Sequence, residues 1–261
     1  MLRLAANLST LFTELPLEAR FDAAAAAGFA AVEIQFPYEL APARLRVLLA
    51  HAGLPLVLFN APPGDAARGE RGLAGLPGRK AEFSASIDRA LEYAAAAGCP
   101  LIHVMAGLES ASHSRALQLD TFAANLADAA DRAAAADVTL LLEPINTRVD
   151  VPGYLLGDNA TAQLLLREAA RPNLGLQFDF YHQQIIGGDL ARGFDAMLPL
   201  IRHVQIADNP GRNEPGTGEI NFSWLLAHVA ASTYAGWTGC EYRPRTDTAS
   251  ALVWARPHLR Q

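Results

Sequence analysis

The chain has 261 residues, of which 51% are hydrophobic and 18% charged, so it is too apolar for an intrinsically disordered protein. Its two cysteines are too few for a disulfide scaffold. The 21 basic and 27 acidic residues leave a net charge of −6, which argues against nucleic acid and anionic membranes as partners.

The N-terminus has no apolar stretch of signal-peptide length, and no run reaches the roughly 20 apolar residues of a membrane helix. We therefore expect a cytoplasmic protein without a membrane segment. Lys80 is the only lysine, and it opens a predicted helix, where we expect it to be solvated. This placement argues against chemistry through a lysine Schiff base.

Short β-rich runs alternate with longer helical runs along the whole chain. The expected strands are residues 2–8, 31–36, 55–60, 101–106, 138–143, 174–180, 203–207 and 238–242. The expected helices are residues 17–27, 43–52, 81–97, 115–136, 159–170, 189–198 and 222–231. Eight strands that alternate with helices in about 250 residues are typical of a (β/α)8 barrel. We predict a single TIM-barrel domain over residues 1–261, with a doubly wound open sheet as the alternative.

Two long loops interrupt this alternation. Residues 61–79 are rich in glycine and proline and carry Arg68, Glu70 and Arg71, and residues 208–220 follow the seventh strand. Structureless loops of such length are usually functional. We predict that both lie at the carboxyl face of the barrel, where barrel active sites form, and that the first is a lid or substrate loop.

Oxygen-bearing side chains stand near the ends of the last four strands: Glu143, Asp179, Gln205 and Glu241. Neighbouring strands lie about 4.8 Å apart, so these four side chains can converge on one point above the barrel. Three carboxylates would repel one another unless a cation lay between them. A set of oxygen ligands suits Mg²⁺ or Mn²⁺ better than zinc. The pattern therefore predicts a divalent metal site.

Each of these residues also has an ordinary structural explanation. Glu143 could be a loop carboxylate, Asp179 could cap the next helix, and Gln205 could be a satisfied core residue. Glu241, taken alone, does not favour a metal ligand over an ordinary structural residue. The metal site rests on the four positions together.

Other polar residues are weaker candidates. His182, three residues after Asp179, could hydrogen-bond a substrate hydroxyl or serve at the start of a helix. We expect His103 and His203 to be core histidines, and Cys240 to face the helix layer, because side chains alternate along a strand. Three residues near earlier strand ends could line the pocket or serve stability: Asn7, Glu33 and Asn60. Walker, serine-hydrolase, HExxH and dinucleotide-binding motifs are absent from the sequence.

Several segments spread over the chain carry a family pattern. They are ANLS at 6–9, FNAPPGD at 59–65, GERG at 69–72, LPGR at 76–79, EPIN at 143–146, IADNPGRNEPGTGEIN at 206–221 and GWTGCEY at 236–242. With these segments the chain resembles the hydroxypyruvate isomerase family of the xylose isomerase-like barrels. The resemblance implies metal ligation by Glu143, Asp179, Gln205 and Glu241, with the two glutamates as acid/base groups.

The resemblance also implies a reaction. Hydroxypyruvate becomes tartronate semialdehyde when a proton leaves C3 and one returns to C2 through an enediolate, which a divalent ion would stabilise. Arg71 or Arg212 would pair with the carboxylate of this small 2-oxo acid, unless both are surface arginines. His182 and Asn60 complete the predicted substrate contacts.

Four alternatives stay open. A 2-oxo-tetronate isomerase shares much of the pattern, whereas related ketose 3-epimerases carry His at the position of Gln205. A DNA-repair nuclease on this barrel would need a histidine-rich zinc cluster and a basic groove, which the seven scattered His residues and the charge of −6 do not supply. The fourth is a catalytically silent barrel that binds a ligand or an ion. A homo-oligomer is compatible with the sequence.

Overall fold

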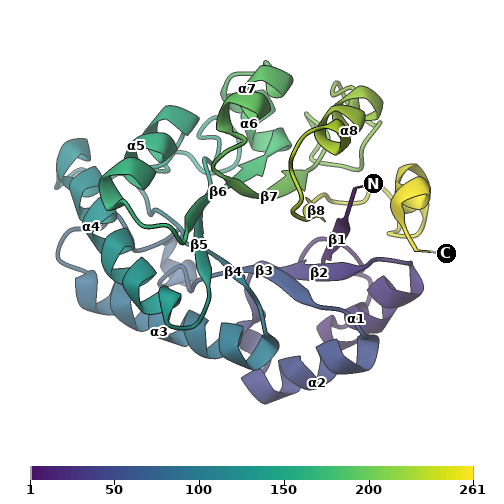
Figure 1. Ribbon diagram of the computed structural model, residues 1–261, viewed down its shortest axis with the longest axis horizontal. Helices are drawn as coiled ribbons and strands as arrows, with labels where there is room; N and C mark the ends of the chain where they lie inside the picture. The colour runs from purple at the N-terminus through teal and green to yellow at the C-terminus, as the bar shows by residue number, and fades with distance from the viewer. Residues whose placement is uncertain (1, 261) are drawn as a thin grey trace.

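The computed structural model describes residues 2–260 as a closed barrel of eight parallel strands. Each strand pairs with its neighbours in chain order, and β8 returns to pair with β1. Figure 1 shows the helices outside this ring of strands. The predicted (β/α)8 barrel is confirmed, and the β8–β1 pairing excludes the open sheet.

All eight predicted strands are present, most of them shorter than expected. They are β1 (Leu4–Asn7), β2 (Ala31–Ile34), β3 (Leu56–Asn60), β4 (Leu101–His103), β5 (Thr139–Leu142), β6 (Leu174–Asp179), β7 (Ile201–Ile206) and β8 (Thr238–Cys240). The helices are α1 (Leu17–Ala26), α2 (Pro42–Ala52), α3 (Lys80–Ala97), α4 (Arg115–Ala134), α5 (Asn159–Ala169), α6 (Phe180–Ile186), α7 (Leu190–Met197) and α8 (Phe222–Ala231), with 3-10 turns η1 (Pro37–Glu39), η2 (Ala66–Arg68) and η3 (Ser250–His258). Among residues 2–260, no helix is long and apolar enough to cross a membrane.

Helix α6 was not predicted from the sequence, and the prediction that the sixth strand extends to Phe180 is wrong. The strand ends at Asp179, whose side chain at once caps α6 by accepting from the backbone N–H groups of Tyr181 and His182. The aromatic and β-branched residues of this helix favour strands by propensity. The cap outweighs that preference.

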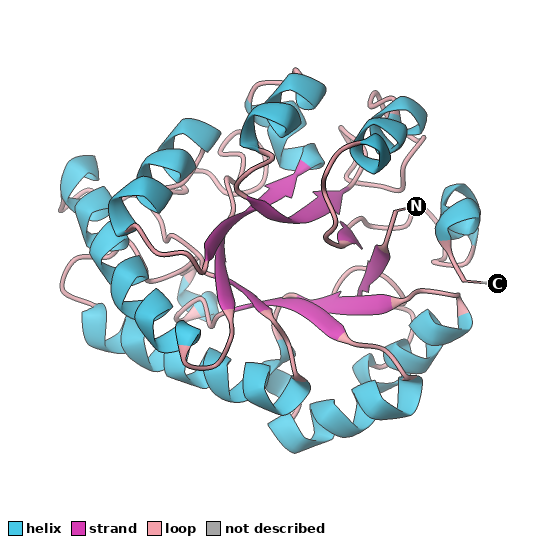
Figure 2. Cartoon of the chain, in the orientation of Figure 1, coloured by secondary structure: helices cyan, strands magenta, loops and turns pink. Residues whose placement is uncertain are grey.

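The main hydrophobic core is built from buried residues of the strands and of the helices that surround them in Figure 2. Cys240 belongs to this layer, as predicted from strand alternation. A small second cluster of Ala5, Ala31 and Val57 packs with Trp237. Lys80 is exposed and pairs with Asp128 on α4, which confirms its surface role.

The stagger of the barrel brings the predicted ligands together. Asp179 pairs in register with Gln205, which pairs in turn with Gly239, two residues before Glu241. In a closed eight-stranded barrel the strands are tilted, so positions of equal height advance by about one residue per strand. Side chains that are offset in register can therefore meet above the barrel.

Candidate active site

A cavity of about 210 Å³ opens at the carboxyl-terminal ends of the strands. Both predicted loops contribute to it, since Arg71 comes from residues 61–79 and Arg212 from residues 208–220. All but one of the predicted site residues line the cavity: Asn60, Arg71, Glu143, His182, Gln205, Arg212 and Glu241. The exception is Asp179, which lies buried in the wall, with its Oδ2 3.7 Å from Nη2 of Arg212.

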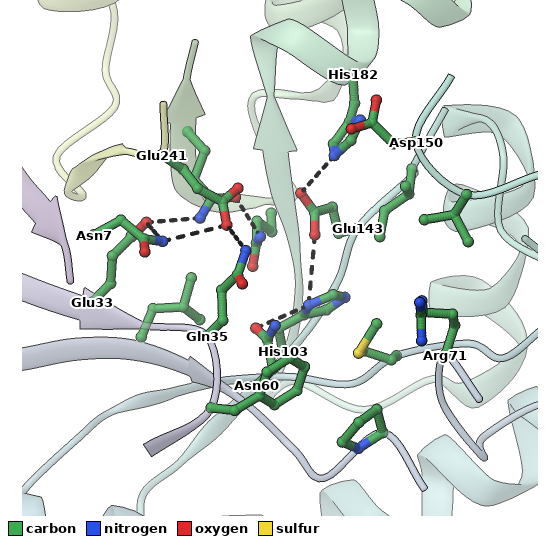
Figure 3. A pocket seen from close by; sticks show the side chains of 18 of the residues that line it. Asn7, Glu33, Gln35, Asn60, Arg71, His103, Glu143, Asp150, His182 and Glu241 are labelled. Carbon is green, nitrogen blue, oxygen red and sulfur yellow. Dashed lines mark hydrogen bonds and ion pairs between the residues drawn. The ribbon is translucent and has the colours of Figure 1, made fainter. Parts of the chain in front are cut away.

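Glu143 directly follows β5, and its side chain is buried. Its Oε2 lies 3.6 Å from Nδ1 of His103, and its Oε1, 4.0 Å from Nε2 of His182, has no hydrogen-bond partner among the described residues. Figure 3 shows this carboxylate between the two imidazoles. Burial raises the pKa of Glu143 well above its usual range, and the charges of Glu241 and Asp179 raise it further.

Asp179 uses its two oxygens differently. Oδ1 caps α6, 2.7 Å from the backbone nitrogen of Tyr181, while the buried Oδ2 has no hydrogen-bond partner within residues 2–260. The two explanations that the sequence left open, helix cap and ligand, are therefore compatible. Burial raises the pKa of Asp179 to about 7, although the charge of Arg212 works in the opposite direction.

Glu241 has a donor on each oxygen. Its Oε1 accepts from the amides of Gln35 at 2.5 Å and Asn7 at 3.3 Å, and its Oε2 accepts from Nη2 of Arg212 at 2.8 Å. Burial raises the pKa of Glu241, and the charge of Arg212 opposes this shift. Its carboxylate is thus held in a fixed orientation, across the cavity from Glu143 (Figure 3).

The amide of Gln205 is oriented by a buried carboxylate beneath it. Its Nε2 donates to Glu33 at 2.8 Å, and its Oε1 accepts from Gln177 at 2.6 Å. Glu33 also accepts from Asn7 at 2.9 Å and lies 2.6 Å from Nε2 of His203. His203 is therefore a core histidine, as predicted. His103 differs from the prediction, because it lines the cavity.

The two candidate arginines have different surroundings. The guanidinium of Arg212 donates to Asp150 at 2.9 Å and to Glu241 at 2.8 Å, and it lies over the ring of Tyr181. Arg71 is exposed at the cavity rim and donates only to the backbone carbonyl of Glu70, without an acidic partner among the described residues. Of the two, Arg71 has its charge available for an anionic ligand.

The donor set fits a divalent cation. Glu143, Asp179 and His182 each place one ligand-type atom within 4.8 Å of the others, and two of these residues carry a buried oxygen that no described residue donates to. Three buried carboxylates with raised pKa values lie at one site, and a positive charge between them would offset their repulsion. Oxygen ligands of this kind suit Mg²⁺ or Mn²⁺.

Several residues of the site were not singled out from the sequence: Gln35, Asn146, Asp150 and Gln177. Strand alternation could have indicated Gln177, two residues before Asp179, and Gln35, two residues after Glu33. Asn146 and Asp150 lie in the irregular segment after β5, where no periodicity reports the direction of a side chain.

The chain is similar to known proteins over nearly its whole length. The model of the xylose isomerase-like TIM-barrel family matches residues 21–259. A 2-oxo-tetronate isomerase of Cupriavidus necator is 51% identical over 99% of both chains, and a hydroxypyruvate isomerase of Escherichia coli is 43% identical over 99% of this chain and 100% of its own. A crystal structure from Brucella melitensis, described as an AP endonuclease of family 2, has a TM-score of 0.96 at 44% identity and covers 99% of this chain and 100% of its own.

The chain therefore belongs to the xylose isomerase-like TIM-barrel family. Within that family its full-length relatives include the hydroxypyruvate and 2-oxo-tetronate isomerases, and the protein is an isomerase of this group.

Proposed function

We propose that the protein is a metal-dependent isomerase that interconverts hydroxypyruvate and tartronate semialdehyde through an enediolate. The observation that carries this proposal is the set of three buried carboxylates at the ends of β5, β6 and β8, two of which keep an oxygen without a hydrogen-bond donor among residues 2–260. The hydroxypyruvate isomerase of Escherichia coli, 43% identical over full length, supports the substrate.

Glu143, Asp179, Gln205 and Glu241 would hold the cation. When bound, it supplies Lewis acidity that stabilises negative charge developing on the substrate oxygens. The residues themselves move the proton. Glu143 accepts the C3 proton, because its buried Oε1 has no hydrogen-bond donor among the described residues. Glu241, held by Gln35 and Arg212, stands on the opposite side as the second acid/base group.

Arg71 binds the substrate carboxylate. Within the described part of the chain, its guanidinium is the one of the two candidates without an acidic partner, and a guanidinium can hold a carboxylate by two parallel hydrogen bonds. Arg212 instead orients Glu241 through their 2.8 Å hydrogen bond. His182 and Asn60 line the same cavity and contact the hydroxyl and carbonyl oxygens of the substrate.

A second candidate is 2-oxo-tetronate, which the relative at 51% identity acts on by name. This acid has the same carboxylate and 2-oxo group with one further carbon, so the same residues would bind it and transfer its proton. A nuclease function is disfavoured. The one candidate metal cluster within residues 2–260 contains a single histidine, and the chain carries a net charge of −6.

The test is an assay of metal-stripped protein, with its metal content verified by elemental analysis, on both acids. Activity should be absent with EDTA and return with Mg²⁺ or Mn²⁺, and the acid with the higher kcat/KM is the substrate. Full activity without metal would overturn the mechanism. Activity on neither acid, or cleavage of DNA at abasic sites, would overturn the proposed substrate class.

A further inference from the structure

We propose that Asn146 fixes the tautomer of His182, so that Nε2 carries the proton and faces the site as a hydrogen-bond donor and not as a metal ligand. The tautomer assignment is independent of the substrate. Its consequence for catalysis rests on the proposed function.

The orientation of the Asn146 side chain is set by backbone groups. Its Oδ1 accepts from the backbone nitrogens of Val149 at 3.0 Å and Asp150 at 3.2 Å, and a backbone N–H can only donate. The Nδ2 group must therefore point the other way. It lies 2.6 Å from Oδ2 of Asp150, which as a carboxylate can only accept. The contacts of Oδ1 and the contact of Nδ2 thus give the same orientation of the Asn146 amide.

This orientation determines the protonation of His182. Its Nδ1 lies 2.8 Å from Nδ2 of Asn146 and 3.5 Å from the backbone nitrogen of the same residue. Both neighbours are donors, so Nδ1 must accept and cannot carry a proton. A neutral imidazole without a proton on Nδ1 carries it on Nε2.

The proton on Nε2 changes the interpretation of the acidic cluster. Nε2 lies 3.8 Å from Oδ2 of Asp179 and 4.0 Å from Oε1 of Glu143, and distance alone groups the three residues as ligands. A metal-bound imidazole nitrogen needs a free lone pair, and its other nitrogen then donates to an acceptor. Asn146 offers no acceptor at that position. His182 therefore donates to a substrate oxygen, and Asn146 acts as a positioning residue through it.

Nitrogen NMR tests the tautomer directly. In the full-length, Mg²⁺-loaded protein with ¹⁵N-labelled histidine, the His182 signals are assigned by their loss in His182→Gln. We expect Nδ1 at the shift of an unprotonated nitrogen and Nε2 at that of a protonated one. The reverse pattern in the wild-type protein overturns the proposal, and this measurement needs no variant at Asn146 to fold.

Substitution of Asn146 supplies the second arm. The test is made in the Asp150→Asn protein, because a second carboxylate 2.6 Å from that of Asp150 would share a proton with it. In that protein the carboxylate that Asn146→Asp introduces can only accept, so the His182 tautomer should reverse, with the proton on Nδ1. Asn173→Asp is the matched control, because Asn173 precedes β6 at the end away from the site and its side chain donates to the carbonyls of Ala130 and Val138. It should leave the His182 signals in place. An unchanged tautomer in Asn146→Asp/Asp150→Asn, compared with Asp150→Asn, contradicts the proposal.

A double-mutant cycle measures the effect on turnover. In the Asp150→Asn protein, Asn146→Asp should lower kcat by about tenfold or more. In Asp150→Asn/His182→Gln, where the glutamine amide donates to the substrate and has no tautomer to reverse, the same change should lower kcat by less than about threefold. Equal losses in both backgrounds would assign Asn146 a merely structural role. Inactivity of the wild type on both acids would refute the proposed function, while the NMR result would still decide the tautomer.

Discussion

The two glutamates of the site differ in how the protein holds them. Glu143 keeps one oxygen without a donor from the described residues, whereas Glu241 receives hydrogen bonds from Gln35, Asn7 and Arg212. Glu143→Gln and Glu241→Gln should each keep the fold, weaken cation binding and lower kcat by about 10²- to 10⁴-fold, since an amide cannot act as a base. The measurement is kcat at saturating Mn²⁺. Turnover within threefold of wild type for both variants would make them ligands only.

Arg71 is predicted to act in binding and not in the chemical step. Arg71→Gln should raise KM for the 2-oxo acid by about tenfold or more, with a smaller effect on kcat, because a charged hydrogen bond to the carboxylate is lost. Arg68→Gln is the matched control, because Arg68 is exposed on the same loop and does not line the cavity. Equal KM values for the two variants would remove Arg71 from the site.

Single residues show what the sequence could and could not predict. Position near a strand end was enough to select the candidate metal ligands Glu143, Asp179, Gln205 and Glu241. The topology of a barrel brings the ends of its strands together. The choice between Arg71 and Arg212 depended on neighbours far along the chain, such as Asp150, which no local pattern reveals. The predicted roles of these residues in binding and catalysis stay predictions.

At the scale of elements, the loop after β7 is organised by one buried carboxylate. Asp208 accepts from the backbone nitrogens of Asn209, Gly216, Gly218 and Ile220 at 2.8–3.1 Å. A Cβ at Gly218 would lie 2.0 Å from the carbonyl oxygen of Asn209, so only glycine fits there. This arrangement presents Arg212 to the cavity.

Asp208→Ala should therefore loosen the loop without opening the barrel. Buried acceptors of this kind contribute about 1–3 kcal/mol. We expect faster hydrogen exchange at the amides of Gly216, Gly218 and Ile220, together with a lower kcat because Glu241 loses its oriented partner. The backbone amides of the core strands β5 and β6 should stay protected from hydrogen exchange, so these strands serve as the internal reference. Unchanged exchange in the loop would contradict this role of Asp208.

The elements themselves were largely predictable. Hydrophobic runs and alanine-rich segments indicated the alternation of strands and helices, and glycines in the left-handed conformation end α2 and α3, at Gly53 and Gly98. The short helix α6 was not predicted because Asp179, which caps it, is also the last residue of β6. Hydrophobic periodicity cannot separate two elements that share one residue.

At the scale of the whole molecule, the buried carboxylates link stability to pH. The pKa of Asp179 is about 7 in the folded protein against an ordinary aspartate value of 3.8, so the folded state binds this proton more tightly than the unfolded state. The contribution of Asp179 to the free energy of unfolding is full below about pH 4 and is lost as pH rises through about 7. The metal-free protein should therefore lose about 1–4 kcal/mol from this group between pH 5 and pH 8.

Thermal unfolding in EDTA across this pH range checks the prediction, with Asp179→Asn as control. Asparagine keeps a helix cap but does not titrate, so its Tm should fall less with pH than that of the wild type. Mn²⁺ at pH 8 should restore the wild-type Tm more than that of the variant. Parallel pH profiles for the two proteins would contradict a titrating Asp179.

In the proposed mechanism Glu143 removes a proton from C3 and Glu241 returns a different proton to C2, with the help of a divalent cation. The decisive measurement is NMR of hydroxypyruvate incubated with the protein in D₂O. This mechanism predicts solvent deuterium at C3 of recovered substrate and at C2 of tartronate semialdehyde, only when Mg²⁺ or Mn²⁺ is present, with loss of both signals in Glu143→Gln. A product whose C2 hydrogen comes entirely from substrate C3, or equal exchange in metal-free protein, would contradict it.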